Sequence, residues 1–265
     1  MRLLINSARL TLSTDNTITI YIHNDITIKK IALISAIIPF SFYNIREATG
    51  NTFKLNDIIY TLPSKQYNAY QLKDAINALI ISTPVNVSFD KSTLHFVFSS
   101  NSSFTFDPLN LGVILGFAKL PNTPYSSSLI NGVHHLESIY ACDMTNQVRN
   151  INIRSNLTIK NYENGVFGGS ILYRIPINTT FGNMIVYQNP SDTLLNVDID
   201  TKISALELTL IDSNYVPLDL NNLSYTLEFF LETTDDDKFA KYNIYNSPLL
   251  STPMVSTHPY ELLRT

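Results

Sequence analysis

The stretch SALELTLIDSNYVPLDLNNLSYTLEFFLE, residues 204–232, decides the fold. Apolar and polar residues alternate in its first part and again in its last part, which is the period of a half-buried strand. The apolar face consists of Leu206, Leu208 and Leu210, and then of Tyr225, Leu227 and Phe229. Asp and Asn residues at 212–214 and 221–222 favour turns, because their side chains bond to their own backbone and they tolerate positive φ. The stretch therefore predicts a β-hairpin, in which every residue pairs, packs or turns.

Short β-segments separated by polar clusters continue this pattern towards the N-terminus. Residues 3–12, 17–23 and 26–38 predict three strands of an antiparallel meander, with turns at 13–16 and at Asn24-Asp25. Later in the chain, residues 146–169 are polar with scattered apolar positions, and we expect a long loop with short strand pieces there. The number of such segments predicts an all-β chain.

One helix is expected, at residues 67–81. Its apolar residues recur at intervals of three and four, with charged residues between them. These apolar residues are Leu72, Ala75, Ile76 and Leu79. Asn68 is suited to cap the N-terminus of this helix, and Thr83-Pro84 to end it.

Composition and turn residues suggest a division of the chain into three parts. Residues 118–131 are mostly Pro, Asn, Ser and Thr, which is typical of a boundary. We therefore expect an N-terminal β-rich part at 1–120, a C-terminal part at 121–232 that completes a sandwich, and an extended tail at 233–265. One sandwich with a long insertion and two stacked β domains both fit this pattern.

The charge of the chain is low for a globular protein. Charged residues make up 15% and the formal net charge is -4, against about 25% charged residues in typical domains. Such a surface favours stable packing against neighbours over free diffusion. No Lys/Arg cluster provides the basic face that specific nucleic-acid binding needs. The most apolar run, residues 31–43, is too short for a membrane-spanning helix.

Residues with metal-binding or nucleophilic side chains gather only around 134–143. His134 and His135 are adjacent, so a strand would point them to opposite faces, and the spacing common in zinc sites is absent. Cys142 is the only cysteine and forms no internal disulfide. We expect it to be a buried structural thiol, because a nucleophile would need a base and an orienting acid beside it.

Two further patterns lack the context of a binding motif. Residues 165–169, GVFGG, do not match the GxGxxG spacing and serve a turn. The run Asp235–Asp237 lacks the alternating ligands and the glycine of a calcium loop, and is expected to be solvated. The sequence thus predicts no catalytic residues, no metal site and no cofactor.

The tail after residue 232 has an aromatic and aliphatic composition in a Pro/Ser/Thr-rich context. The apolar residues of this tail follow neither the period of a strand nor that of a helix, so they do not fit a hydrophobic core. A tail this apolar is seldom simply solvated. We predict an arm that contacts a neighbouring subunit, whereas a tail wrapped on its own domain is the alternative. The predicted contact residues are Phe239, Tyr242, Tyr245, Leu249, Leu250 and Tyr260.

Four stretches resemble a known family in their order and spacing. The first is IALISAIIPFSFYNI at 31–45. The second is YNAYQLKDAINALI at 67–80, followed by VSFD and LHFVF, and the third is LGVILGF at 111–117. The fourth consists of SIYACDM and ILYRIPI together with residues 206–232. The chain resembles the jelly-roll penton or minor capsid proteins of virophages and polinton-like double-stranded DNA viruses over most of residues 1–232.

This resemblance implies a jelly-roll-type antiparallel β-sandwich with one helix in the N-terminal half and an extended C-terminal arm. It implies a structural capsid protein, not an enzyme, which forms pentamers at the fivefold vertices of an icosahedral shell. Its partners would be further copies of itself and a major capsid protein built from two jelly rolls. The protein would be synthesised in the host cytoplasm and located in the virion.

The alternative is a receptor-binding or glycan-binding spike or fibre-head protein. The 15 Tyr and 14 Phe residues suit sugar contacts as well as subunit interfaces, although the chain has no Trp. An enzyme fits the sequence least.

Overall fold

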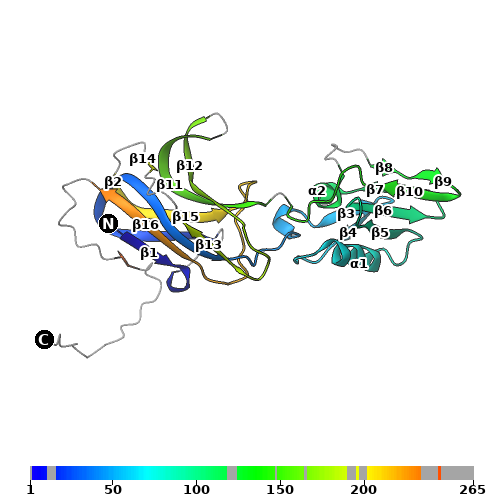
Figure 1. Cartoon of the computed structure of the whole chain (residues 1–265), viewed down its shortest axis with the longest axis horizontal. Coiled ribbons are helices and arrows are strands. Elements are labelled where there is room, and N and C mark those ends of the chain that lie inside the picture. Colours follow the sequence, from blue (N-terminus) through cyan, green and yellow to red (C-terminus); the bar gives the residue numbers. More distant parts are fainter. Residues whose placement is uncertain are drawn as a thin grey trace, which may run out of the picture.

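A computed structural model describes residues 2–10, 16–117, 124–146, 148–163, 166–189, 195–196, 202–233 and 244–245. Antiparallel strands make up most of it, which confirms the predicted all-β, jelly-roll-type sandwich class. Two bodies lie end to end along the long axis of the molecule (Figure 1). We call them the first unit, whose core comes from residues 3–42 and 148–231, and the inserted unit, residues 45–144.

The long strand β2 (Thr17–Pro39) organises the first unit, because strands pair along both of its edges. One edge carries, in succession, β13 (Met184–Gln188), β14 (Leu195–Asn196) and β15 (Lys202–Ile211). The other edge carries β16 (Thr226–Thr233) and then β17 (Ile244–Tyr245). β15 and β17 pair with the first half of β2, whereas β13, β14 and β16 pair with its second half. β2 therefore runs through both layers of a sandwich.

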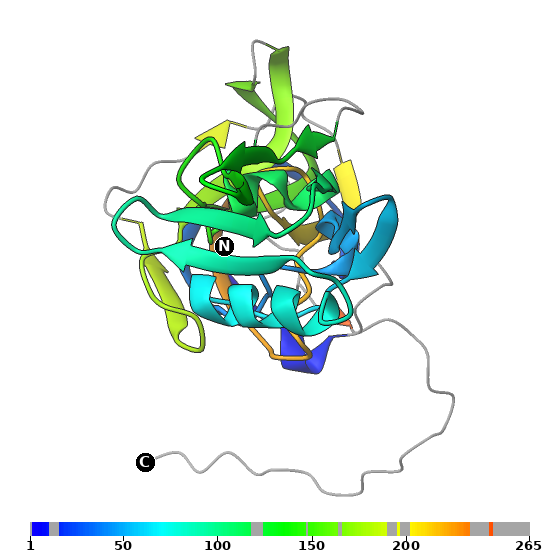
Figure 2. The ribbon, with the colours of Figure 1, turned by 90° about the vertical axis from the view of Figure 1, so that its right-hand side faces the viewer.

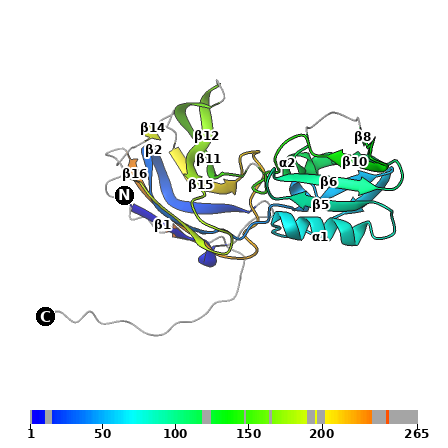
Figure 3. The same ribbon diagram turned by 45° about the vertical axis from the view of Figure 1, so that its right-hand side comes forward.

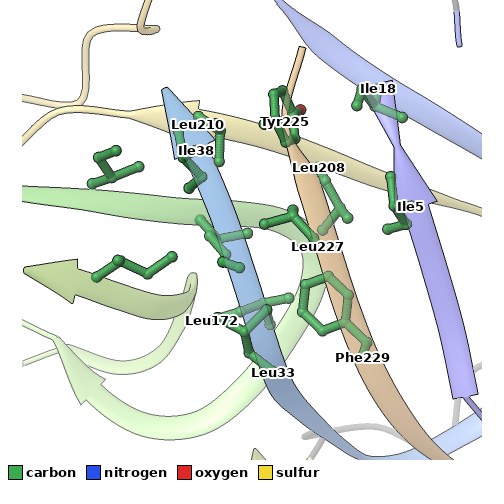
Figure 4. Packing of buried hydrophobic residues seen from close by; sticks show 14 of the residues in the cluster. Ile5, Ile18, Leu33, Ile38, Leu172, Leu208, Leu210, Tyr225, Leu227 and Phe229 are labelled. Atoms are coloured by element: carbon green, nitrogen blue, oxygen red, sulfur yellow. The ribbon is translucent and has the colours of Figure 1, made fainter. Parts of the chain in front are cut away.

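The remaining strands extend these layers outward. β1 (Arg2–Asn6) pairs with β16, β11 (Asn150–Glu163) pairs with β15, and β12 (Val166–Pro176) pairs with β11. Side chains from both layers form one hydrophobic cluster, in which Leu33 and Phe229 lie near Leu172 and Leu208 (Figure 4). The predicted apolar face of residues 204–232 is confirmed, since all six of its side chains are buried.

Two irregularities in β2 explain why its buried positions change parity. The β2 residues in the hydrophobic cluster are Ile18, Ile20, Ile26 and Ile28, then Ile31 and Leu33, then Ala36 and Ile38. The register with β16 shifts once between Ile28 and Lys30 and again between Leu33 and Ser35. An extra residue in one strand reverses the alternation beyond it. The two shifts keep the apolar side chains of a 23-residue strand on the core side.

Three sequence predictions about the first unit are wrong. β15 and β16 do not pair as a hairpin, because β2 lies between them. The N-terminal meander does not form either: β1 pairs with β16, and β2 continues without interruption through Asn24-Asp25. Residues 146–169 do not form the expected loop, because residues 150–163 and 166–176 form a long strand pair. In the first two cases the local pattern was β-like, but the pairing partner lies far away in the sequence. In the third case the partner strand follows directly, but the polar composition of residues 146–169 concealed the strands.

The inserted unit has two small sheets and the predicted helix. β3 (Thr52–Leu55), β4 (Ile58–Thr61), β7 (Thr105–Asp107) and β8 (Tyr125–Ser126) form one sheet. β5 (Asn86–Asp90), β6 (His95–Ser100), β9 (Ser128–Ile130) and β10 (Val133–Glu137) form the other. The helix α1 (Ala69–Leu79) lies along β5 (Figure 2), and a short helix α2 (Gly112–Leu115) follows β7.

Local signals determine much of this unit. The predicted N-cap is confirmed: the side chain of Asn68 accepts a hydrogen bond from the backbone of Gln71, and the side chain of Gln71 accepts one in return. β5 pairs with β6 across a short turn. Aromatic rings fill the core, and those of Phe98 and Phe106 lie 4.4 Å apart.

The predicted division of the chain into two domains between residues 120 and 121 stays a prediction. Strand pairs join residues on both sides of it, because β6 pairs with β10 and β7 pairs with β8. The two hydrophobic clusters group residues 45–117 separately from residues 3–42 and 148–231. Most of the tail at 233–265 lies outside the described residues.

Candidate functional site

The chain crosses between the two units twice, and the two crossings are bonded to each other. Asn44 ends the first crossing and is buried. Its side chain donates to the carbonyl oxygens of Tyr67 and Met144, each at 2.8 Å, and accepts from the Tyr67 amide at 2.9 Å. Asn146 in the second crossing donates to the carbonyl oxygen of Asn44 at 3.0 Å. The two ends of the inserted unit are therefore held side by side (Figure 3).

A buried ion pair fastens the inserted unit to the first unit at this point. The guanidinium of Arg46 contacts the carboxylate of Asp212 at 2.5 Å, and the side chain of Asp212 is fully buried. Asp212 also accepts hydrogen bonds from the backbone amides of Asn214 and Val216. Burial lowers the pKa of Arg46, and the charges of Asp212 and Asp219 oppose that change. The predicted turn at 212–214 thus holds a charge in the interior as well.

A largely apolar groove opens beside the junction, and we call it the junction groove. It has a volume of about 550 Å³. Its walls come from residues within 40–44 and 66–68, from Met144, Thr145, Val148 and Arg149, and from the connection between β12 and β13. The rings of Phe40 and Phe181 meet edge to face at 5.8 Å, and the Phe181 side chain is exposed. Such a concave surface with few polar groups is suited to apolar side chains of a ligand.

Exposed aliphatic side chains continue from the groove onto the outer face of the sheet. Ile37 on β2 is 43% exposed, and Met184 and Val186 on β13 are 47% and 53% exposed. Val186 lies directly opposite Ile37 in the register, and Met184 lies opposite Pro39. We call these three residues the outer apolar surface. Contiguous exposed apolar residues mark interaction sites, whereas single ones are ordinary.

A polar cleft of about 430 Å³ lies on the other sheet of the first unit. Thr17, Thr209 and Arg154 form one row across β2, β15 and β11. The hydroxyls of Thr17 and Thr209 are 2.6 Å apart. Glu207 lies in the next row. The Arg154 guanidinium and the Glu207 carboxylate make no hydrogen bond or ion pair with other described residues.

The histidines and Cys142 do not form a site in the described structure. His134 and His135 lie on β10, and the His134 ring is 3.5 Å from the hydroxyl of Ser127. Cys142 packs against the inserted-unit core, and burial raises the pKa of its thiol, which favours the protonated form. No group of three or more His, Cys, Asp or Glu side chains is placed to hold a metal ion among the described residues.

The other predicted residues are placed only in part. Tyr245 belongs to β17 and lies opposite Tyr21 of β2. Phe239, Tyr242, Leu249, Leu250 and Tyr260 lie outside the described residues, as does the run Asp235–Asp237. Gly168 and Gly169 lie within β12, and Gly165 is outside the described part. No helix in the described part is long and apolar enough to cross a membrane.

Comparisons with known proteins show a likeness to a solved structure. No family model matches the sequence, and no curated protein matches it. The crystal structure of the selenomethionine-labelled mavirus penton protein is similar, with 14% sequence identity and a TM-score of 0.47. The match covers 88% of this chain and 100% of the penton chain. The proposals that follow rest on the residues of this chain.

Proposed function

We propose that the chain is a structural capsid protein, a penton-type subunit that forms the fivefold vertices of an icosahedral shell. The observation that carries the proposal is the outer apolar surface of Ile37, Met184 and Val186, which the described chain leaves uncovered. With only 15% charged residues, the protein has little surface charge to oppose association. Obligate assemblies bury such surfaces in interfaces of roughly 2,000 Å² or more.

The proposed partners are further copies of this chain and a double-jelly-roll major capsid protein, and the proposed location is the virion. A ring needs two different complementary surfaces on each subunit, because its contacts are heterologous. The first unit offers two unlike sides. β12 and β13 lie on the side of the junction groove, whereas β1 and β17 lie on the opposite side of β2.

Light scattering on the purified full chain, over a range of concentration and salt, tests the proposal. We expect a stable mass of five chains. Replacing Ile37 and Val186 together by Glu should lower this mass to that of one chain, because buried unpaired charges oppose the interface. Ile81→Glu is the matched control, since Ile81 is exposed at the far end of α1 and should leave the mass unchanged. A trimer, or a mass that the double variant leaves unchanged, contradicts the proposal.

The polar cleft favours a second candidate, a glycan-binding spike or fibre head. Hydroxyl, amide, guanidinium and carboxylate groups line it, and they match the donors and acceptors of a sugar. Titration of the chain with a panel of neutral monosaccharides tests this candidate. Saturable binding that Arg154→Ala and Glu207→Ala both abolish, in a protein that forms no ring, favours it over the capsid role.

A further inference from the structure

We propose that residues 246–265 of one copy bind in the junction groove of the next copy. The inference rests on the proposed ring, and it specifies which surface of the neighbour receives the arm. It depends on three features of the described structure: the place where the chain leaves β2, the side on which the groove opens, and the chemistry of the groove.

The chain leaves the described structure at Tyr245, on the edge of β2 that also carries β16. β17 is antiparallel to β2, so the direction of β17 is towards Thr17. Thr17 lies opposite Thr209, close to the end of β15, and the next residue after β15 is Asp212 at the junction. The arm therefore starts on a course towards the junction end of the first unit. Residues 246–265 span at most roughly 65–70 Å when extended.

The groove opens on the opposite side of the first unit. Ile177 and Phe181, which line it, belong to the connection from β12 to β13. β13 pairs with the edge of β2 that carries β15, and β12 is the outermost strand beyond β15. An arm folding back on its own groove must pass from the edge of β2 that carries β16 and β17 to the opposite edge, at the end where the inserted unit is attached. In a head-to-tail ring, the arm side of one copy faces the groove side of the next.

The chemistry of the arm fits that of the groove. Apolar residues occur throughout the arm, at Leu249, Leu250, Met254, Val255, Tyr260, Leu262 and Leu263. The groove presents the rings of Phe40, Tyr43 and Phe181 and the side chain of Val148. Apolar burial stabilises such a contact by about 25 cal/mol per Å² removed from water. Pro248, Pro253 and Pro259 keep the arm extended, because proline disfavours a helix.

Disulfide trapping between two full-length variants tests the inference. Both carry Cys142→Ser, which removes the native thiol. One adds Thr179→Cys at the groove, and the other adds Leu250→Cys in the arm. The matched control replaces the groove cysteine by Ser82→Cys, because Ser82 is exposed in the turn that follows α1, at the end of this helix away from Asn68 and the junction.

After mixing and mild oxidation, we expect at least about tenfold more covalent dimer with the groove cysteine than with the control, because binding raises the effective concentration of the two thiols. Thr180→Cys serves as a second groove position, and circular dichroism verifies that each variant is folded. A single chain carrying both cysteines should form covalent chains of several copies. An internal disulfide within one copy would overturn the inference, and so would equal trapping by control and groove variants.

Light scattering on the same samples separates the two proposals. A five-chain mass without groove trapping overturns the arm contact and leaves the ring in place. Groove trapping in a protein whose mass is that of a trimer overturns the fivefold ring and retains the arm contact.

Discussion

The two units of the molecule differ in how far along the chain their contacts reach. In the inserted unit, β3 pairs with β4 and β5 pairs with β6, so neighbouring segments meet after a short turn. In the first unit, β1 pairs with β16, and β2 pairs with five strands that all follow residue 183. Local sequence therefore specifies much of the inserted unit, whereas the first unit needs almost the whole chain.

The cores of the two units differ in chemistry as well. Ile and Leu dominate the first core, and five of its buried isoleucines lie on β2 between Ile18 and Ile31. The second core is rich in stacked and tilted phenylalanine rings, including Phe53, Phe98 and Phe106. β-Branched side chains suit a long pleated strand with neighbours on both edges. Large rings fill the space between two small sheets and a helix with few residues.

The largest expected effect comes from breaking the ion pair that joins the units. Arg46→Ala leaves the fully buried carboxylate of Asp212 without its partner, and should lower the free energy of unfolding of the first unit by about 3–5 kcal/mol. Chemical denaturation followed by far-ultraviolet circular dichroism measures this change. Arg149→Ala is the control, because its side chain is 76% exposed and 3.8 Å from Asp143. Equal effects of the two variants would show that the buried pair does not fasten the units.

Removing one ring from the second core tests whether the units unfold separately. Phe98→Ala should destabilise the inserted unit by about 3–5 kcal/mol, because the ring is fully buried against Phe106. Scanning calorimetry should then show the transition of the inserted unit at a lower temperature and the other transition unchanged. Leu208→Ala should produce the converse. A single transition that both variants shift equally would mean that the two cores unfold as one.

The helix cap offers a smaller, strictly local test. Asn68→Ala removes one half of the reciprocal bonding with Gln71, and should lower the stability of the inserted unit by about 1 kcal/mol. The midpoint of urea unfolding reports the change. Asn68→Asp keeps an acceptor at the cap and should retain most of the stability. Equal losses in both variants would assign the effect to something other than the cap.

The smallest expected effect concerns a buried hydroxyl in the first core. The Tyr225 hydroxyl has no hydrogen-bond partner among the described residues, and burial raises the pKa of this group. Tyr225→Phe removes an unsatisfied polar atom and should leave stability unchanged or raise it by up to about 1 kcal/mol. Tyr67→Phe is the contrast in the inserted unit, because its hydroxyl donates to the Pro63 carbonyl at 3.0 Å. It should lower stability, and the urea midpoints of both variants measure the difference.

The sequence predicted faces, turns and caps better than it predicted partners. The alternation at Leu206 and Leu227 identified the buried face correctly, and Asn221 and Asn222 do adopt positive φ. The same alternation does not indicate which strand pairs with this one, because any strand whose apolar side chains lie on the same face could be the neighbour. The hairpin prediction failed for that reason: β2 separates β15 from β16.

The candidate site was less accessible to prediction than the fold. Asp212 has the sequence context of a turn residue, and its side chain does accept a hydrogen bond from Asn214 in the turn. No residue near Asp212 in the sequence indicates that its ion-pair partner is Arg46, 166 residues away. The junction groove likewise combines Phe40 with Met144 and Phe181, which only the completed fold brings together. The closely spaced aromatic residues Phe40, Phe42 and Tyr43 are the local signal for such a groove, since aromatic residues are enriched at interfaces.

The position of β2 in the chain has a consequence for synthesis on the ribosome. Residues 17–39 emerge early, while the strands that cover their two edges lie between residues 184 and 245. At about 5–20 residues per second, the nascent β2 waits on the order of 10–40 s for its partners. During this interval an isoleucine-rich strand has two open edges, which is a template for aggregation. The inserted unit is completed first and can fold while β2 has no partners. We therefore expect chaperones to bind the nascent chain at β2, the segment that precedes the inserted unit.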